Sequence, residues 1–426
     1  MEPEKTLSAW WGSATGRTVR TGSGVVYRIQ YPGRLNGGSG PDYRGAVLHM
    51  GGRTLLGDVE LHVRSSDWRR HGHDSDHEYD SVVLHVVFKD DSHGNTTLAS
   101  GKSVHVAVPQ RELCPSSSAQ LPCVGRYAVE PARVSEVLAR EGITRLLGKG
   151  KCAAELLRRV GSHRALLLLV ARTLGYTSNS AQFEALAHHL CVPSVQAVLQ
   201  SCSDLEREAL LMGLAGLLPS QRKLSEFQGL KDCLFYEEAW RCLGLEHLSM
   251  PTGEWKLGCI YPNNHPVRRL VGLADLLPSL RSTSEELGSS LASRLPQYPS
   301  LRVFEERVRV QGHDYWRGHY DFHRPTPDSD VVGRGKAREI VVNALLPLAV
   351  AMTSRDILNL ARLNTAIRAY PATGPNAITR HMRAQLGIGR VAVPAVESQG
   401  MLRLFGLYCT RGLCEECPLG GRPLAS

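Results

Sequence analysis

The sequence has no long apolar run of the kind that crosses a membrane. Its longest apolar cluster, ALLLLVA at 165–171, is flanked by Arg164 and Arg172, whereas a membrane helix needs roughly 18–20 apolar residues. The first residues, MEPEKTLSAWW, are acidic in character and lack the apolar core of a signal peptide. We therefore expect a cytoplasmic protein without a membrane partner.

The short motifs of several enzyme classes are also missing. There is no G-x-x-x-x-G-K-[ST] string for an ATP phosphate loop, and the GRGK stretch at 333–336 is too short to serve as one. There is no G-x-S-x-G string of a serine hydrolase. No cysteine is singled out together with a histidine and an asparagine, as a cysteine protease would need. Any chemistry must therefore come from other side chains.

The overall composition is that of a globular protein with a basic surface. The chain has 426 residues, 42% of them hydrophobic, and a net charge of +9, so two or three domains are expected. Arginine dominates the basic residues, and guanidinium groups bind phosphate in a bidentate manner. DNA or RNA is therefore an expected partner, although an ordinary basic surface would give the same charge.

Local patterns predict an α+β fold. A helix is expected over 4–11, followed by strands over 24–33, 43–50 and 54–63, of which the last two are joined by a Gly51-Gly52 hairpin turn. A helix or ordered loop begins near Ser66 or Asp67, and strands follow over 81–88 and 104–108. The predicted order is thus αβββαβ.

The rest of the chain divides by composition. We predict an α/β domain over 1–112, a Ser- and Pro-rich linker over 113–130, a mainly helical domain over 131–400 and a Cys-containing tail over 401–426. The helical assignment depends on apolar residues three and four positions apart.

Acidic residues and histidines concentrate in the predicted hairpin. Glu60 and His62 lie two positions apart, so they share one face of a strand, as does Asp58. Asp42, at the head of the preceding strand, can approach them across the hairpin. Asp42 and Glu60 would then hold Mg²⁺ or Mn²⁺ for phosphodiester hydrolysis, and His62 would orient the attacking water. The same side chains could instead cap a turn, form an edge salt bridge and face solvent.

Further histidines near this hairpin leave a second interpretation open. His71, His73 and His85 could support the carboxylates, or they could form a zinc or iron site of imidazoles and carboxylates. Such a site would suit a metal hydrolase that acts on a small molecule. Glu4, on the first predicted helix, could add another carboxylate.

These residues resemble the motifs of the PD-(D/E)xK nuclease superfamily. Pro41-Asp42 is similar to its second motif and Glu60-Leu61-His62 to its third, while Glu4 is similar to the acidic residue of its first helix. The resemblance implies a restriction-endonuclease-like core and a metal-dependent nuclease. His62 stands where that superfamily usually has lysine, which favours as an alternative a non-catalytic nucleic-acid-binding protein with a degenerate nuclease core.

Two basic helix starts are the expected nucleic-acid contacts. Arg268 and Arg269 follow an Asn-Asn-His-Pro turn, and Lys336 and Arg338 lie in the first turns of a helix that begins near Gly333. Cations at a helix N-terminus have the wrong sign for the helix dipole and often mark an anion site. Both groups could equally be solvated helix faces.

The chain as a whole resembles a bacterial family of unknown function, DUF2851. The resemblance is carried by GDVELHVRSSDWRRHGHDSDHEYDSVVLHVVFKDD, LGYTSNSAQFEALA, YPNNHPVRRLVGLADLL, AREIVVNALLPL, SQGMLRLFGLYC and CEECPLG, which follow one another in this order. It implies that the α/β head, the helical middle and the tail act together.

Three of the 11 cysteines cluster at the C-terminus. Cys409, Cys414 and Cys417 have the spacing C-x4-C-x2-C, which suits one metal ion or cluster. The candidates for a fourth ligand are Cys114, Cys123, Cys259 and His381. Some PD-(D/E)xK exonucleases have a similar plan, in which three C-terminal cysteines and one upstream cysteine hold a 4Fe-4S cluster. Structural Zn²⁺ and free reduced thiols are the alternatives.

Overall fold

The computed structural model describes residues 3–109, 123, 131–176, 178–224, 231–258, 260–292, 301–353, 357–389 and 393–420. The chain forms two compact units. The first unit comprises residues 1–142, 375–392 and 397–426, and the second comprises 143–374 and 393–396. The predicted domain boundaries stay a prediction, but the grouping shows that the C-terminal tail belongs to the same unit as the N-terminal strands.

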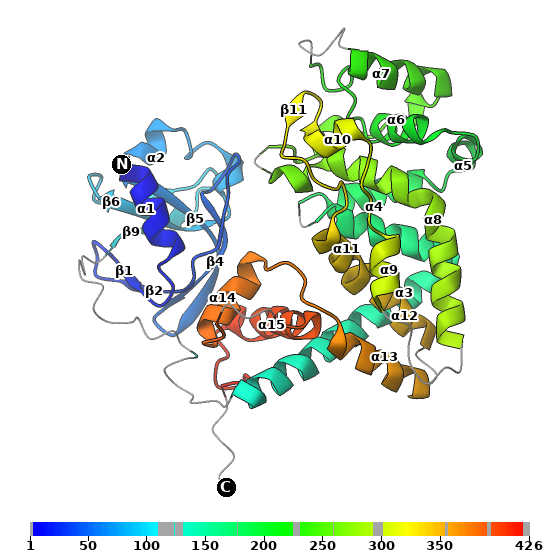
Figure 1. Cartoon of the computed structure of the whole chain (residues 1–426). Helices are drawn as coiled ribbons and strands as arrows, with labels where there is room; N and C mark the ends of the chain where they lie inside the picture. Colours follow the sequence, from blue (N-terminus) through cyan, green and yellow to red (C-terminus); the bar gives the residue numbers. More distant parts are fainter. Residues whose placement is uncertain are drawn as a thin grey trace. The chain divides into compact units, whose positions relative to one another are not determined.

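A closed six-stranded β-barrel forms the centre of the first unit (Figure 1). Around the barrel the strands follow the order β2, β1, β9, β6, β5 and β4, and β4 pairs with β2 to close it. Two neighbouring pairs, β5 with β6 and β6 with β9, are parallel, and the other pairs are antiparallel. The strands are β1 (Thr18–Thr21), β2 (Val26–Tyr31), β4 (Tyr43–Met50), β5 (Arg53–Arg64), β6 (Val82–Lys89) and β9 (Val106–Pro109).

The hairpin between β4 and β5 is confirmed. Gly51 and Gly52 have φ of +53° and +78°, and Met50 pairs with Arg53 across the turn. Positive φ at both central residues is what a tight hairpin turn requires, and glycine adopts it without a steric penalty. The turn thereby fixes the register of β5, the strand that carries Glu60 and His62.

The crossover from β5 to β6 is short and irregular. It contains the helix α2 (Asp67–Arg70) and the 3-10 turn η1 (His77–Tyr79). In the parallel register that results, Glu60 lies opposite His85 and His62 opposite Val87. The crossover therefore brings its own histidines to the same end of β5.

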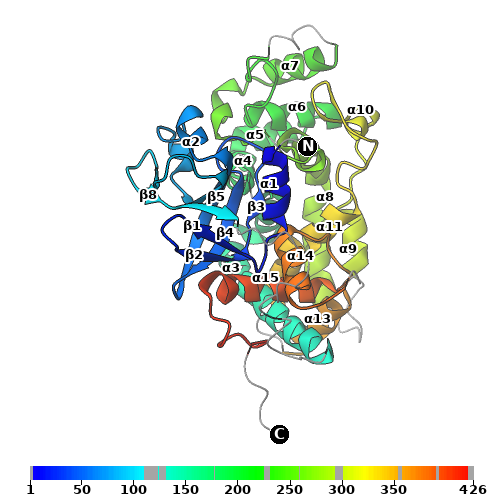
Figure 2. The ribbon, with the colours of Figure 1, turned by 90° about the vertical axis from the view of Figure 1, so that its left-hand side faces the viewer.

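The first helix, α1 (Pro3–Gly12), contributes two large side chains to the core of this unit. It lies against β5 (Figures 1 and 2) and buries Leu7 and Trp11 among strand residues such as Ile29 and Leu61. Burial of a leucine side chain contributes roughly 1.5–3 kcal/mol. The indole N–H of Trp11 donates to the carbonyl of Pro32 at 2.8 Å, so the buried ring leaves no polar group unpaired.

The predicted restriction-endonuclease-like αβββαβ core is wrong, although the α+β class holds. The strand β1 was not predicted, and it pairs with both β2 and β9. Together with the pairing of β2 and β4, it turns the expected open sheet into a closed barrel. The fold therefore gives no support to the PD-(D/E)xK resemblance, and the site must be judged from its own geometry.

Shorter elements complete the first unit. Tyr31 of β2 makes ring contacts with His381 and Phe405, at centroid separations of 4.8 and 5.1 Å. Two C-terminal helices are thereby packed against the barrel. The remaining elements are β3 (Arg34–Leu35), β7 (Thr96–Thr97), β8 (Ser103–Val104), α14 (Ala377–Gln385), α15 (Ala395–Leu407) and the 3-10 turn η7 (Cys409–Arg411).

The second unit is helical, as predicted for most of this stretch. Its helix α6 (Asp204–Leu214) begins with a capping box of Ser203 and Glu206, and every residue from Arg207 to Leu214 is buried. The unit also contains α3 (Pro131–Leu174, kinked at Gly161), which belongs to it from residue 143 onward, α4 (Ser180–His189), α5 (Pro193–Leu199), α7 (Lys231–Leu243), α8 (Pro266–Ala292), α9 (Leu301–Arg307), α10 (Asp314–Gly318), α11 (Arg334–Ile340), a π-helical turn (Val341–Leu345), α12 (Leu346–Thr353), α13 (Ile357–Ala369) and the hairpin of β10 (His319–Asp321) and β11 (Arg324–Pro325). Within the described residues, none of the helices combines the length and apolar character needed to span a membrane.

Candidate metal centre

Three histidines and one glutamate converge at the end of β5 in the first unit. Glu60 and His62 project from the same face of β5, because they lie two residues apart. His71 follows α2 directly, and His73 comes after Gly72, whose φ of +78° allows the turn between them. Among the described residues, His62, His71 and His73 are the one group of three donors whose ligand atoms all lie within 4.8 Å of one another.

The spacing of these donors suits a single metal ion. His62 Nε2 lies 3.1 Å from His71 Nδ1 and 3.6 Å from Glu60 Oε1, and His73 Nε2 lies 3.4 Å from the same oxygen. Ligands that surround an ion tetrahedrally at about 2.0–2.1 Å are separated from one another by about 3.4 Å. The three distances bracket this value. Among the described residues, however, only the three histidines form a group of donors that all lie within 4.8 Å of one another, and Glu60 is not part of that group. The arrangement therefore fits an ion held by three imidazoles, with Glu60 beside His62 and His73.

A chain of hydrogen bonds fixes the orientation of His62. Its Nδ1 lies 2.9 Å from His85 Nε2, and His85 Nδ1 lies 2.8 Å from Thr96 Oγ1. Burial and the neighbouring histidines lower the pKa of both His62 and His85 to about 3. Both rings are therefore neutral at pH 7, which is the form in which an imidazole binds a metal ion.

Aromatic side chains line the buried side of the site. Tyr79 stacks on His73 with ring centroids 3.8 Å apart, and Trp68 meets His62 edge-on at 6.4 Å. The indole N–H of Trp68 donates to the carbonyl of Thr97 at 3.2 Å. His62 is 1% exposed, whereas His71 lies on the surface, so the site opens to solvent on the His71 side.

Asp42 lies beside Glu60, as its predicted role requires. Its backbone N–H donates to Glu60 Oε2 at 2.8 Å, and its own Oδ2 accepts from the backbone N–H of Leu61 at 3.1 Å. Burial, followed by the charge of Glu60, raises the pKa of Asp42 to about 7. Glu4 of α1 contributes to the same increase, so it lies within electrostatic reach of Asp42. The structure thus brings Asp42, Glu60, His62 and Glu4 together.

Asp58 has a different position from the one predicted. Its two carboxylate oxygens accept from the backbone N–H of Gly45 at 2.8 Å and from Ser81 Oγ at 2.7 Å. A register shift between Asp58 and Val59 interrupts the alternation along β5. Asp58 therefore links neighbouring strands and does not join the histidines.

Three residues of this site could not be singled out from the sequence. Thr96, Trp68 and Tyr79 carry no spacing signal for metal chemistry, and Thr96 reaches His85 only because the strands bring them together. The histidines His71, His73 and His85, in contrast, were visible as a dense group and all lie at the site.

The four basic residues predicted to contact nucleic acid lie in the second unit, where each makes hydrogen bonds or ion pairs with other residues of that unit. The guanidinium of Arg268 is fully buried and donates to the carbonyls of Trp316, His319 and Ser329. Arg269 donates to Val331 O, Lys336 to Glu339, and Arg338 to Glu305 and Ala372 O. Nucleic-acid binding by these residues stays a prediction, while their contacts give each of them a structural role.

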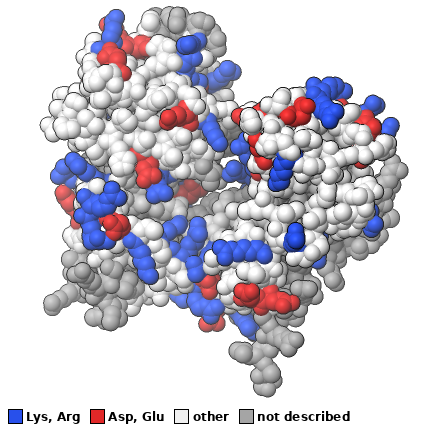
Figure 3. All heavy atoms as spheres, turned by 180° about the vertical axis from the view of Figure 1, so that it is seen from behind, with Lys and Arg blue, Asp and Glu red and all other residues white. Residues whose placement is uncertain are grey.

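Basic residues are spread over the face of the molecule that Figure 3 shows. In the view of Figure 3, Lys and Arg side chains are scattered over the visible face, and Asp and Glu side chains lie among them. The net charge of +9 therefore does not correspond to one continuous basic patch on this face.

The C-terminal cysteines lie near one upstream cysteine in the first unit. Burial is the main cause that raises the pKa of Cys123 to about 12, and the thiols of Cys414 and Cys417 add to the increase. Burial likewise raises the pKa of Cys409, with Cys123, Cys417 and Cys414 contributing. Of the predicted fourth ligands, Cys114 and Cys259 lie outside the described residues, and His381 packs against Tyr31.

The turn that carries these cysteines is tightly packed. The backbone N–H of Cys417 donates to Cys414 O at 3.3 Å, and that of Gly420 to Cys417 O at 2.7 Å. A Cβ on Gly420 would lie 1.9 Å from the carbonyl oxygen of Cys414, so only glycine fits at this position. Close packing of this kind fixes the backbone between Cys414 and Gly420.

Comparison with known proteins gives one match. A family model described as "Protein of unknown function (DUF2851)" matches residues 4–370. Neither the curated proteins nor the solved structures contain a significant match to the chain.

Proposed function

Because the chain belongs to the DUF2851 family, whose description gives no reaction, we propose its chemistry from the site alone: the protein is a hydrolase that depends on a divalent transition-metal ion. The observation that carries the proposal is the convergence of His62, His71 and His73 at mutual distances that suit one ion, with Glu60 beside two of them.

The donor set also indicates the kind of metal. Imidazole nitrogens suit Zn²⁺ and Fe²⁺, whereas Mg²⁺ and Mn²⁺ prefer sites made of oxygen ligands. The three proposed ligands are all imidazoles, so we propose Zn²⁺ or Fe²⁺ in place of the Mg²⁺ or Mn²⁺ that Asp42 and Glu60 alone would suggest. Such an ion supplies Lewis acidity and lowers the pKa of a coordinated water molecule to about 7.

The residues around the ligands have separable roles. If His62 binds through Nε2, its Nδ1 carries the proton and donates to His85 Nε2, which leaves His85 to donate from Nδ1 to Thr96 Oγ1. His85 and Thr96 are thus positioning residues that hold His62 in one tautomer. Asp42 orients Glu60 through its backbone N–H and places a second carboxylate beside the site, where it can accept a proton from water.

Access to the centre is from the side of His71. The buried rings of His62, Trp68 and Tyr79 exclude water behind the ligands, while the exposed His71 leaves the front open. Three protein ligands with an open fourth position are typical of catalytic zinc sites, whereas structural sites are closed by four protein ligands. Three histidine ligands would leave that fourth position for water, with Glu60 beside it.

For the substrate we propose a phosphodiester, with DNA or RNA as the first class to test. The net charge of +9 supports an anionic substrate, and the exposed Arg69 and Arg70 stand next to His71 in the sequence. Arg70 is 69% exposed in its side chain and also pairs with Asp67 at 2.9 Å. A small phosphoester and a role in binding nucleic acid without cleavage are the other outcomes of the test.

We further propose that the C-terminal cysteines and Cys123 hold a second, structural metal group, either Zn²⁺ or a 4Fe-4S cluster. The four thiols lie near enough to act on one another electrostatically, and both groups accept thiolate donors. No three of these sulfur atoms, all of which belong to described residues, lie within 4.8 Å of one another, so the 4Fe-4S cluster, whose thiolate ligands stand farther apart than those of one Zn²⁺, is the group to test first. The described cysteines are all free thiols, which supports a reducing, cytoplasmic location as part of the same proposal.

The experiment is a hydrolysis assay on the full chain reconstituted with Zn²⁺, Fe²⁺, Mn²⁺ or Mg²⁺ and on the chain treated with a chelator. The substrates are labelled single- and double-stranded DNA and RNA, together with bis(p-nitrophenyl) phosphate and p-nitrophenyl phosphate. The variants are Glu60→Gln and His73→Ala, and His77→Ala is the matched control because His77 lies in the same loop with an 80% exposed side chain.

The proposal predicts cleavage that requires the metal, falls at least about 100-fold in Glu60→Gln and His73→Ala, and is unchanged in His77→Ala. Cleavage of nucleic acid establishes the nuclease, and cleavage of the nitrophenyl esters alone establishes a small substrate. Binding of nucleic acid that is equal in all variants, without any cleavage, would contradict the hydrolase.

A further inference from the structure

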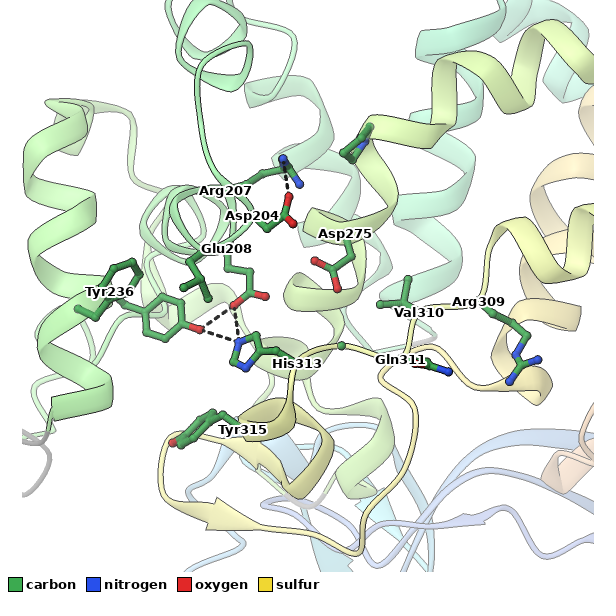
Figure 4. A pocket seen from close by; sticks show the side chains of 14 residues that line it. Asp204, Arg207, Glu208, Tyr236, Asp275, Arg309, Val310, Gln311, His313 and Tyr315 are labelled. Carbon is green, nitrogen blue, oxygen red and sulfur yellow. Dashed lines mark hydrogen bonds and ion pairs between the residues drawn. The ribbon is translucent and has the colours of Figure 1, made fainter.

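A second site lies in the helical unit, separate from the histidines. A cavity of about 920 Å³ opens between α6, α7, α8 and the segment 309–315 (Figure 4). Its volume is in the range of pockets that hold small organic molecules. The wall contains three carboxylates, of Asp204, Glu208 and Asp275, and two guanidinium groups, of Arg207 and Arg309.

Both guanidinium groups already have partners. Arg207 Nη2 lies 3.0 Å from Asp204 Oδ1, and Arg309 lies 2.7 Å from Glu306 and 3.1 Å from Asp330. Their charges are therefore matched by these acids, although Arg207 still acts on Asp275 at longer range.

Glu208 is held firmly at the inner end of the cavity. It is 1% exposed, and its Oε2 accepts from the hydroxyl of Tyr236 at 2.6 Å and from the indole N–H of Trp316 at 3.0 Å. His313 Nε2 lies 3.3 Å from the same oxygen, and this contact raises the pKa of His313. Oε2 is thus fully occupied, while the other oxygen of Glu208 is turned toward the cavity (Figure 4).

Asp275 is the acid of the wall that makes no direct contact with a cation among the described residues. Within the described residues it takes part in no hydrogen bond or ion pair, and Figure 4 shows its carboxylate directed into the same space as that of Glu208. Burial, together with the charges of Glu208 and Asp204, raises its pKa to about 6, although Arg207 and His313 act in the opposite direction. A positive charge placed beside Asp275 would relieve this repulsion.

The outer part of the wall is apolar. Leu205 and Phe235 are 40% and 43% exposed, although large apolar side chains usually lie inside. Pro278 and the ring of Tyr315 continue this surface. A cavity with a carboxylate inside and uncovered apolar groups at the rim matches a molecule that carries a cation on an apolar body.

The carboxylates of this cavity are not arranged as the ligands of one metal ion. Among the described residues, the carboxylates of this cavity do not form a group of three donors close enough to share one ion. We propose that the cavity binds a small organic cation, with a primary ammonium group placed between Asp275 and Glu208 and an apolar body against Phe235 and Leu205. This site is independent of the proposed hydrolase centre.

The experiment measures binding of 2-phenylethylamine to the full chain by isothermal titration calorimetry at pH 7.5. The neutral 2-phenylethanol and the anionic 3-phenylpropionate are the reference ligands, since they have a similar apolar body. The variants are Asp275→Asn, which keeps the size of the side chain, and Phe235→Ala, which changes an exposed residue. Glu246→Gln, an exposed acid outside the cavity lining, is the matched control.

The proposal predicts that the amine binds at least tenfold more tightly than the alcohol or the acid. Its affinity should fall at least tenfold in Asp275→Asn and severalfold in Phe235→Ala, and it should be unchanged in Glu246→Gln. Equal affinity for the amine and the alcohol, undiminished binding to Asp275→Asn, or no binding of the amine at millimolar concentration would each overturn it. Thermal melting of every variant shows that the fold persists.

Discussion

Replacement of Arg268 by lysine tests whether the basic residues of the second unit are structural. The guanidinium of Arg268 donates from Nη1 to the carbonyls of Trp316 and His319 and from Nη2 to Ser329 O at 2.7 Å and Ser329 Oγ at 3.0 Å. A lysine ammonium is a single point charge and cannot reach both sets of acceptors, because it lacks the planar fork of arginine. At least two buried acceptors would lose their donors.

The expected cost follows from these contacts. Hydrogen bonds to a charged group contribute about 1.5–3 kcal/mol each, so the loss of two predicts a decrease of about 3–6 kcal/mol in the free energy of unfolding. The buried Trp316 lies beside the guanidinium, so its fluorescence reports on this unit during urea unfolding. Arg324→Lys, at an exposed position in β11, is the control and should leave the transition unchanged.

The opposite result would refute the reasoning. If Arg268→Lys unfolded at the same urea concentration as the parent protein and instead weakened binding to DNA or RNA, Arg268 would be a nucleic-acid contact. A loss of stability with unchanged nucleic-acid binding per folded molecule is the result that the geometry predicts.

Three other predictions concern separate parts of the molecule. Thr96→Val removes the acceptor of His85 and should lower the metal affinity of the histidine site about 10–100-fold, as measured by competition with a chelator; an unchanged affinity would remove Thr96 from the positioning chain. Burial lowers the pKa of Lys149 to about 7, so above pH 7 the unfolded chain binds a proton that the folded chain does not. The free energy of unfolding should therefore rise between pH 7 and 9, by up to about 1.4 kcal/mol per pH unit, and Lys149→Met should flatten this rise in urea titrations at both pH values. Finally, Cys123→Ser should remove the tail's zinc or iron from the purified protein, as measured by elemental analysis, whereas Cys191→Ser should retain it; equal metal content in both would exclude Cys123 as a ligand.

The parts of the fold that depend on local sequence signals could be predicted. The helix α1, the hairpin of β4 and β5 and the strand β6 follow from apolar periodicity and from Gly51-Gly52, which are local signals. The barrel closure could not be predicted in this way. It depends on β1, a strand of four residues that includes charged Arg20, and on pairing of β2 with β4 in addition to β1.

The residues of the candidate site fall into the same two groups: those that a local pattern places and those that only the pairing of distant segments places. Glu60 and His62 could be placed on one face because the strand alternation is regular there, whereas the register shift at Asp58 takes that residue out of the alternation. The position of His85 opposite Glu60 follows from the parallel register of β5 and β6, which the sequence alone does not reveal. The arginines of the second unit resembled surface cations because charge in a sequence carries no information about burial.

The proposed hydrolase depends on one metal ion bound by His62, His71 and His73. The most direct test of that binding is the ratio of metal to protein, measured by elemental mass spectrometry after dialysis, for the Cys123→Ser background and for the same background with His71→Ala and His73→Ala or with His77→Ala. The account predicts one Zn²⁺ or Fe²⁺ per chain in the background and in the His77→Ala variant, and a loss of that ion when His71 and His73 are both replaced. An unchanged ratio in the double variant, or the absence of any ion from the background even after reconstitution, would contradict it.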